Sequence, residues 1–341
     1  MSEIKPDVFC GSKVWGHVKV TRRNVLTNEI DLVIDKKNTL LYSWLNGLFT
    51  NGNKTMIGAS DRTHKWLTDY DNTVMYGCAI GTNSTPPTRT DTFDQTRCLA
   101  YVTTGETVAR SEYGISPVSL TRKWVFPAGI GTGTLNEVFL TTYSTGLARQ
   151  VFQNPVEKTA YHELTVEWTL NLSGGATQGE ILNGQRDGQT AVRWKTFINN
   201  RLAWAWANGF YSDYGSSSMT RPLFRFAINP AYYVILGSSN DDSDLALDAP
   251  FTLKGTKIWE GYPVTGSNYA YTNGNCYRDI RVGLDTAQGN GAIGEMLVVE
   301  RFTKTAAYSE EPICRITFTP ALDKVDTYQL FMDLRIGLNL S

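Results

Sequence analysis

Three histidines are the only imidazoles in the chain that could act as general bases or metal ligands. His17, His64 and His162 lie far apart in sequence, and none belongs to an H-E-x-x-H or H-x-x-x-H spacing. A G-x-S-x-G motif, which would mark a nucleophilic serine, is also missing. For His162 we favour an ordinary solvated imidazole. We therefore predict no catalytic residue, and the chain is not expected to be an enzyme.

A run of alternating glycines has the composition of a phosphate-binding loop. It consists of Gly129, Gly131 and Gly133, but the Lys and Ser or Thr that complete a P-loop do not follow. The run also precedes a segment with the pattern of a strand rather than a helix. We interpret it as a turn, because glycine readily adopts the backbone conformations that tight turns require, and we predict no cofactor-binding residue.

An acidic segment is the best candidate for a metal site. Asp241, Asp242 and Asp244 are followed by Asp248, and calcium prefers clustered oxygen ligands of this kind. The segment lacks the central glycine and the terminal glutamate of an EF-hand loop. Calcium binding by the loop 241–248 stays open, but we favour a solvated surface loop and predict no metal ligand.

The five cysteines never form a C-x-x-C pair, so buried thiols are expected instead of zinc or disulfides.

An internal repeat organises the elements that must position these residues. Apolar and polar residues alternate over 164–172, with the period of two that is typical of a half-buried strand. The same alternation returns over 330–338 at an offset of 166 residues. Other pairs at this offset are Arg149 and Arg315, Phe152 and Phe318, and Lys158 and Lys324. The chain therefore contains two copies of one arrangement of strands.

Two glutamates also correspond between the copies, at a shorter offset. Glu137 and Glu295 are 158 residues apart, and each lies in a segment that begins with glycine and continues with apolar residues. Paired carboxylates can cleave glycosides, but only at a fixed separation across a cleft, which a sequence does not reveal. We expect each glutamate to orient a turn or an interface.

Each copy also contains a segment with helical spacing. In the first copy, Asn38 is placed to cap a helix that extends to Phe49. Its apolar face would be formed by Leu40, Leu41, Trp44, Leu45 and Leu48. In the second copy, apolar residues recur at about four-residue intervals before Gly209, which suits a helix C-terminus; they are Trp194, Ile198, Leu202 and Trp206. We predict one short amphipathic helix in each copy.

These elements predict a mainly β fold with two related β-sandwich-like domains in tandem. Small residues at 173–176 mark the join, so the expected domains are 1–173 and 174–341. Strands are expected at 74–80, 97–102, 120–126, 222–228, 278–284 and 311–318. The alternative is a βαβ fold, but one helix in each copy supplies too few crossovers for a parallel sheet.

Composition excludes several functional classes. With 32 Lys and Arg against 33 Asp and Glu, the net charge is -1, which does not favour binding to a polyanion. Neither a signal sequence nor a run of eighteen apolar residues occurs, so we expect a soluble protein without a membrane span. Aromatic residues crowd the second copy and could stack on a host-surface glycan, form a protein interface, or belong to the core and ordinary surface: Trp206, Phe210, Tyr211, Tyr214, Trp259, Tyr262, Tyr269, Tyr271 and Tyr277. They are not accompanied by a basic stripe, so nucleic acid is not an expected partner.

The N-terminal copy carries a pattern of turns and strands with a known counterpart. A strand pair leads into the segment 38–49, then into Ala79, Gly81 and Thr82 with two prolines nearby, and later into the strand 133–140. This pattern resembles tail-associated structural proteins of tailed bacteriophages, and the resemblance covers about the first half of the chain. In the second copy the segment 236–240 replaces the Gly-Thr segment.

The resemblance implies a non-enzymatic structural protein of the virion tail, synthesised in the host cytoplasm. Its partners would be other virion tail proteins and copies of itself in a symmetric oligomer. Since collagen-like, heptad and short β-helix repeats are missing, a compact connector such as an adaptor, collar, baseplate or fibre-base component fits better than a fibre shaft. A carbohydrate-binding receptor module on the virion and a head decoration protein are the alternatives.

The phase of the strand 164–172 can be tested by mutation. Trp168 should face the core, so Trp168→Ala should lower the free energy of unfolding by about 3–5 kcal/mol, the scale for truncating a buried aromatic residue. Glu167→Ala should change it little, because Glu167 points to the opposite face. Urea unfolding of both variants measures the difference. A larger effect of Glu167→Ala would mean that the strand phase is wrong.

Overall fold

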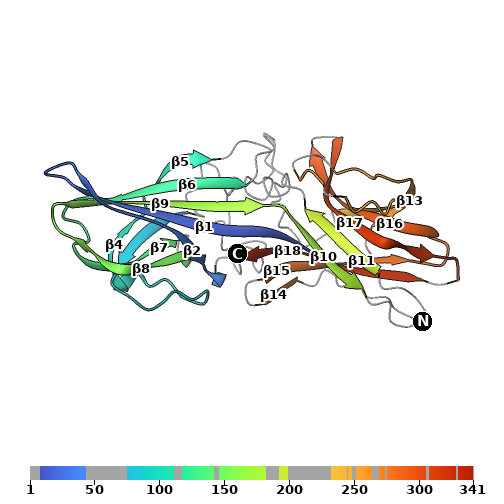
Figure 1. Ribbon diagram of the computed structural model, residues 1–341, viewed down its shortest axis with the longest axis horizontal. Coiled ribbons are helices and arrows are strands. Elements are labelled where there is room, and N and C mark those ends of the chain that lie inside the picture. Colours follow the sequence, from blue (N-terminus) through green and yellow to red (C-terminus); the bar gives the residue numbers. More distant parts are fainter. Residues whose placement is uncertain are drawn as a thin grey trace.

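The structure is a computed structural model that shows an elongated, mainly β protein, as predicted (Figure 1). It describes residues 8–43, 75–110, 117–141, 146–181, 192–198, 232–243, 245–247, 251–262, 269–272, 275–304, 307–327 and 329–340. Among these residues, no helix has the length and apolar character that a membrane span requires.

Strands form nearly all of the regular structure. In the first half they are β1 (Val8–Asn24), β2 (Ile30–Leu40), β3 (Gly77–Gly81), β4 (Cys98–Val102), β5 (Glu106–Arg110), β6 (Val118–Phe126), β7 (Gly133–Thr141), β8 (Gly146–Lys158) and β9 (His162–Ser173). The second half contains β10 (Gly175–Ile181), β11 (Val192–Ile198), β12 (Tyr232–Gly237), β13 (Lys257–Gly261), β14 (Tyr269–Thr272), β15 (Asn275–Leu284), β16 (Gly291–Lys304), β17 (Ala307–Lys324) and β18 (Leu330–Leu340). A short 3-10 helix, η1 (Gln95–Arg97), precedes β4.

The strand predictions are confirmed wherever the structure describes them. The alternating segments 164–172 and 330–338 lie in β9 and β18, and five of the six other predicted segments overlap β3, β4, β6, β15 and β17. The sixth segment, 222–228, lies outside the described residues. Trp168 is fully buried, as predicted, and its indole N–H donates to Cys78 Sγ at 3.4 Å.

Both predicted helix starts are wrong. Asn38 does not cap a helix, because it lies inside β2 opposite Gly16 of β1, and helical backbone begins only at Tyr42. Trp194 and Ile198 belong to β11, which has hydrogen-bonded strands on both sides. An interval of four residues also returns a side chain to the same face of a strand, so the spacing did not distinguish the two structures. The other positions of both predicted helices, except Leu40 and Leu41, lie outside the described residues.

The same strand order occurs twice. One path of the larger sheet runs β1-β2-β8-β7-β3-β4, and the six-stranded sheet runs β10-β11-β17-β16-β12-β13. The larger sheet also contains the ribbons β5-β6-β9 and β14-β15-β18. Strands of the first half lie at one end of the molecule and most strands of the second half lie at the other (Figure 1).

The first strand connects the two ends. Its residues 13–24 pair antiparallel with β9, while residues 8–14 pair in parallel with β18 near the C-terminus of the chain. In space, β1 therefore extends past residue 173, where the join between the two domains was expected (Figure 1). Parallel pairing of segments this far apart in sequence could not be deduced from the alternation of either strand.

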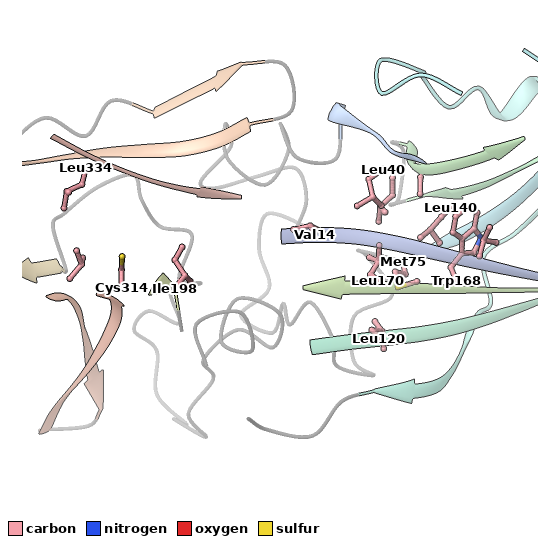
Figure 2. Close-up of a cluster of buried hydrophobic side chains, with 14 of the residues drawn as sticks. Val14, Leu40, Met75, Leu120, Leu140, Trp168, Leu170, Ile198, Cys314 and Leu334 are labelled. Atoms are coloured by element: carbon pink, nitrogen blue, oxygen red, sulfur yellow. The ribbon is translucent and has the colours of Figure 1, made fainter. Parts of the chain in front are cut away.

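The core is continuous along the molecule. A single cluster of buried apolar side chains contains Trp168 and Leu140 from the first half and Ile198, Cys314 and Leu334 from the second. Figure 2 shows these groups on either side of Val14 of β1. Burial of such side chains is the main favourable contribution to the folding free energy, since each removes apolar surface from water.

Deletion of the N-terminal half of β1 should destabilise the protein. Removing residues 1–14 leaves β18 without its parallel neighbour, so several backbone hydrogen bonds are lost, each contributing about 0.5–1.5 kcal/mol. We expect a lower thermal midpoint in calorimetry than for the intact chain. Removal of residues 1–7, which precede β1, is the matched control. Equal midpoints for the two truncated proteins would contradict the pairing.

Candidate functional site

Each half of the molecule buries a pair of oppositely charged side chains at the same place in its sheet. Glu137 on β7 lies beside Arg149 on β8, and Glu295 on β16 lies beside Arg315 on β17. All four residues are buried, and the second pair is fully inaccessible to solvent. Removing charges from water is costly unless they are paired and hydrogen-bonded. The two pairs and the loops that they contact therefore form the candidate functional site.

The first pair holds a surface loop through a third charged residue. Arg149 Nε donates to Glu137 Oε2 at 2.7 Å, and Arg149 Nη1 donates to Asp91 Oδ2 at 2.6 Å. Asp91 also accepts hydrogen bonds from the backbone N–H and the hydroxyl of Thr88. The second carboxylate oxygen of Glu137 accepts the N–H of Asn83. The loop between β3 and η1 is thereby fixed at several points.

Electrostatics favours the charged form of Asp91. Burial raises the pKa of its carboxyl group, but the hydrogen bonds from Thr88 and Arg149 outweigh burial and leave the pKa below its ordinary value. The guanidinium of Arg149 also lies over the ring of Phe139, 5.4 Å from its centroid. Arg149 is thus in contact with two residues of β7 and with the loop between β3 and η1.

In the second pair, a backbone carbonyl takes the place of the aspartate side chain as the acceptor for the arginine. Arg315 Nε and Nη2 lie 3.0 and 2.9 Å from Glu295 Oε2. Glu295 Oε1 accepts the N–H groups of Lys254 and Gly255 at 3.0 and 2.7 Å. Arg315 Nη2 also donates to the carbonyl of Asp241. Two segments between β12 and β13 are therefore held by one buried ion pair.

The acidic loop belongs to this second network. Asp241 Oδ2 accepts from Lys254 Nζ at 2.6 Å, and its other oxygen accepts from the N–H of Ser243 at 2.9 Å. These hydrogen bonds, chiefly the one from Lys254, hold the pKa of Asp241 far below its ordinary range. Asp244 and Asp248 lie outside the described residues. Within the part of the chain that is described, no three His, Cys, Asp or Glu residues gather in a way that could hold a metal ion.

A glycine leaves room for each glutamate. Gly81 in β3 pairs with Glu137, and Gly237 in β12 pairs with Glu295. A Cβ atom would lie 2.5 Å from Glu137 Oε1 at the first position and 2.8 Å from Glu295 Oε1 at the second. The glycine at position 81, between Ala79 and Thr82, is thus explained by the carboxylate packed against it.

Buried lysines hold the glycine-rich turns. Lys158 Nζ donates to the carbonyls of Pro127 and Ile130 at 2.8 and 2.7 Å, so the run 129–133 is a turn, as predicted. Burial lowers the pKa of Lys158. Lys324 Nζ donates in the same way to the Thr286 carbonyl and the Asn290 side chain in the turn before β16. Gly131 and Gly289, 158 residues apart, both have a φ of 63°, which glycine adopts without strain.

The other candidates lie apart from these networks. His17 pairs with Asp35 at 2.6 Å, and His162 contacts Asp31 and Thr159, so His162 is not simply solvated. His64 lies outside the described residues. Cys78 and Cys314 are buried, as expected for cysteine in an apolar core. Burial raises the pKa of Cys78 to about 12.

The aromatic residues of the second half do not all belong to one surface. Trp259 packs against the main core, whereas Tyr262 is 54% exposed. Tyr269 and Tyr271 lie on β14 and Tyr277 on β15. The remaining members, Trp206, Phe210, Tyr211 and Tyr214, lie outside the described residues.

The comparisons with known proteins add no relative. No protein-family model, no curated protein and no solved structure matches the chain. The structural support for a proposed function therefore comes from the geometry of the described residues.

Sequence reasoning found part of this site. Glu137 and Glu295 were expected to orient a turn or an interface, and both hold loops. Arg149 and Arg315 were noticed only as repeated positions. Asp91, Thr88 and Lys254 were missed, because they lie in loops where neither spacing nor alternation indicates a partner. The sequence offered one signal for the buried pairs, which was a charged residue among apolar residues of a predicted strand.

Removing the arginine of the second pair should be strongly destabilising. Arg315→Met leaves the Glu295 carboxylate buried without its counterion, which costs about 3–5 kcal/mol in the free energy of unfolding. Arg193→Met, an exposed change in β11 with the same loss of charge, is the control. Urea unfolding measures both. The double variant Arg315→Met with Glu295→Met should recover stability, and equal effects of the two single changes would contradict this role.

Proposed function

We propose that this chain is a non-enzymatic structural protein of a tailed-phage virion. It acts as a tail-associated connector, as an adaptor, collar, baseplate or fibre-base component, and assembles with copies of itself as a symmetric oligomer. Its two halves are proposed to be related β-sandwich-like units. The resemblance of the N-terminal half to tail-associated proteins motivates the class, and the structure supports it through the features below.

The observation that carries the proposal is the use of buried charge in both halves. Arg149 with Glu137, and Arg315 with Glu295, each hold surface loops through hydrogen bonds to backbone or side-chain groups. A symmetric assembly repeats one contact many times, so the loops that form it must have the same shape in every copy. Fixed loops on a β framework satisfy that requirement.

The shared strand supports the same role. Because β1 is hydrogen-bonded to β9 in one half and to β18 in the other, it ties the two ends of the molecule together. The apolar core extends across both halves. A connector that transmits force along a tail benefits from a body that resists bending between its ends.

The carbohydrate-binding alternative has one specific observation in its favour. Tyr262 presents more than half of its surface to solvent and could stack on a sugar ring. Trp259 is less suitable for that role, since it packs against the core. A glycan array separates the two functions, because saturable binding that is lost in Tyr262→Ala would favour a receptor module.

Quantitative mass spectrometry of purified virus particles tests the proposal. We expect a fixed copy number, calibrated against the portal ring, of roughly three, six or twelve per tail, as symmetric oligomers require. Purified tails and purified heads are analysed separately as the control. A copy number that follows the head lattice would indicate a decoration protein, and absence from particles would refute the virion role.

A further inference from the structure

Exposed apolar side chains gather at one end of the molecule. Four large residues there, which we call the apolar tip, expose between 42% and 71% of their surfaces: Val25, Leu26, Ile30 and Tyr161. The first three belong to the hairpin of β1 and β2, and Tyr161 lies in the turn between β8 and β9. Figure 1 shows the blue turn between β1 and β2 protruding at this end. Contiguous exposed apolar residues mark contacts with other proteins or with membranes.

The two turns that carry the tip are joined to each other. Val25 N–H donates to the Tyr161 carbonyl at 2.9 Å. Within the second turn, Tyr161 N–H donates to the Thr159 hydroxyl at 3.3 Å, and Thr159 N–H donates to His162 Nδ1 at 3.2 Å. The exposed side chains of both turns are therefore held on one surface.

The backbone donors of the first turn are also satisfied within the chain. The side-chain oxygen of Asn24 accepts the N–H groups of Leu26 and Thr27 at 2.9 and 3.4 Å. Asn24 N–H donates to the Glu29 carbonyl at 2.9 Å, and Glu29 N–H donates to the Thr27 hydroxyl at 3.4 Å. The N–H groups of residues 24–27 and 29 thus already have acceptors.

Satisfied donors decide which kind of partner suits the tip. The apolar part of a bilayer offers no hydrogen-bond acceptor, so a segment enters it without a large penalty only when its backbone groups are paired internally. Protein partners that bind a strand or a loop commonly use free backbone groups for affinity. The tip instead offers apolar side chains over a backbone whose donors are occupied, which favours a lipid surface.

Charge beneath the tip is consistent with this choice. Arg22 pairs with Asp31 and Arg23 pairs with Glu163, each at 2.8 Å. Paired charges are less costly to bring close to an apolar phase than single ones. Neither the turn 24–29 nor the turn 159–161 contains lysine or arginine, and Glu29 is their only charged residue. Attraction to anionic headgroups therefore does not contribute, and the surface that fits is a neutral, zwitterionic one.

We propose that the apolar tip inserts into the interfacial region of a lipid bilayer. Leu26, the most exposed of the four residues at 71%, enters the acyl boundary. Tyr161 lies at the level of the headgroups, where an amphipathic ring is favoured. The protein then lies on the membrane and does not span it. This inference goes beyond the proposed function and rests on the tip alone.

Vesicle flotation with the purified full-length protein tests the insertion. Over a series of phosphatidylcholine concentrations, Leu26→Ser should lower the partition coefficient by about tenfold, because most of the apolar side chain is removed. Leu26→Trp should retain or raise it, since tryptophan favours the interface. Val325→Ser, a change of an apolar residue that is 45% exposed in the turn after β17, is the matched control and should have no effect. Circular dichroism verifies that each variant is folded.

The lipid composition provides a second readout. Adding phosphatidylserine to the vesicles should leave the partition coefficient unchanged or lower it, and added salt should have little effect, because the tip carries no basic residue. Binding that requires phosphatidylserine and disappears at high salt would mean that a charged surface elsewhere is responsible, and it overturns the proposal.

The remaining outcomes decide between the tip and other contacts. Flotation that is weakened by Leu26→Ser and unaffected by Val325→Ser supports insertion. Absence of flotation at every lipid concentration overturns it, as do equal effects of the two serine variants. Self-association without lipid that is lost in Leu26→Ser, together with no flotation, assigns the tip to a protein contact and also overturns it. The virion role is decided separately by copy number in particles.

Discussion

The hydrogen-bonding of β1 is the constraint on which the rest of the structure depends. Residues 13–24 provide the edge to which β9 is added, and residues 8–14 do the same for β18. Because backbone donors and acceptors must be paired when they are buried, both ends of the molecule rely on one strand. The continuous core follows from this arrangement, since Val14 lies where side chains of the two halves meet.

Within this framework, buried charge gives the loops their positions. An ion pair in the interior contributes little net stability compared with an apolar pair, but it requires specific partners. Arg149 and Arg315 meet that requirement through Glu137 and Glu295, and through Asp91 or the Asp241 carbonyl in the loops. The physical consequence is specificity of loop shape, which is what a repeated contact in an assembly needs.

The predictions from sequence succeeded where one local rule decides the structure. Alternation placed Trp168 in the core, and glycine spacing identified the turn 129–133, because strand faces and turn backbones depend on neighbouring residues. The helix predictions failed at Asn38 and Trp194 for the opposite reason. Asn38 was expected to cap a helix and Trp194 to begin one through its four-residue spacing, which suits either a helix or a strand. Hydrogen bonds to other strands decided both outcomes.

The sequence by itself determined that the protein is mainly β, which residues of β9 face inward, and that Glu137 and Glu295 occupy matching positions. Only the tertiary structure decided that β1 pairs with β18, that Lys254 and Asp91 complete the charged networks, and that β2 pairs with β8 at Thr39 and Leu40. The physical reason is the distance along the chain over which each interaction acts. Periodicity reports the face on which a side chain lies, whereas strand pairing and loop contacts join residues whose separation along the chain carries no local signal.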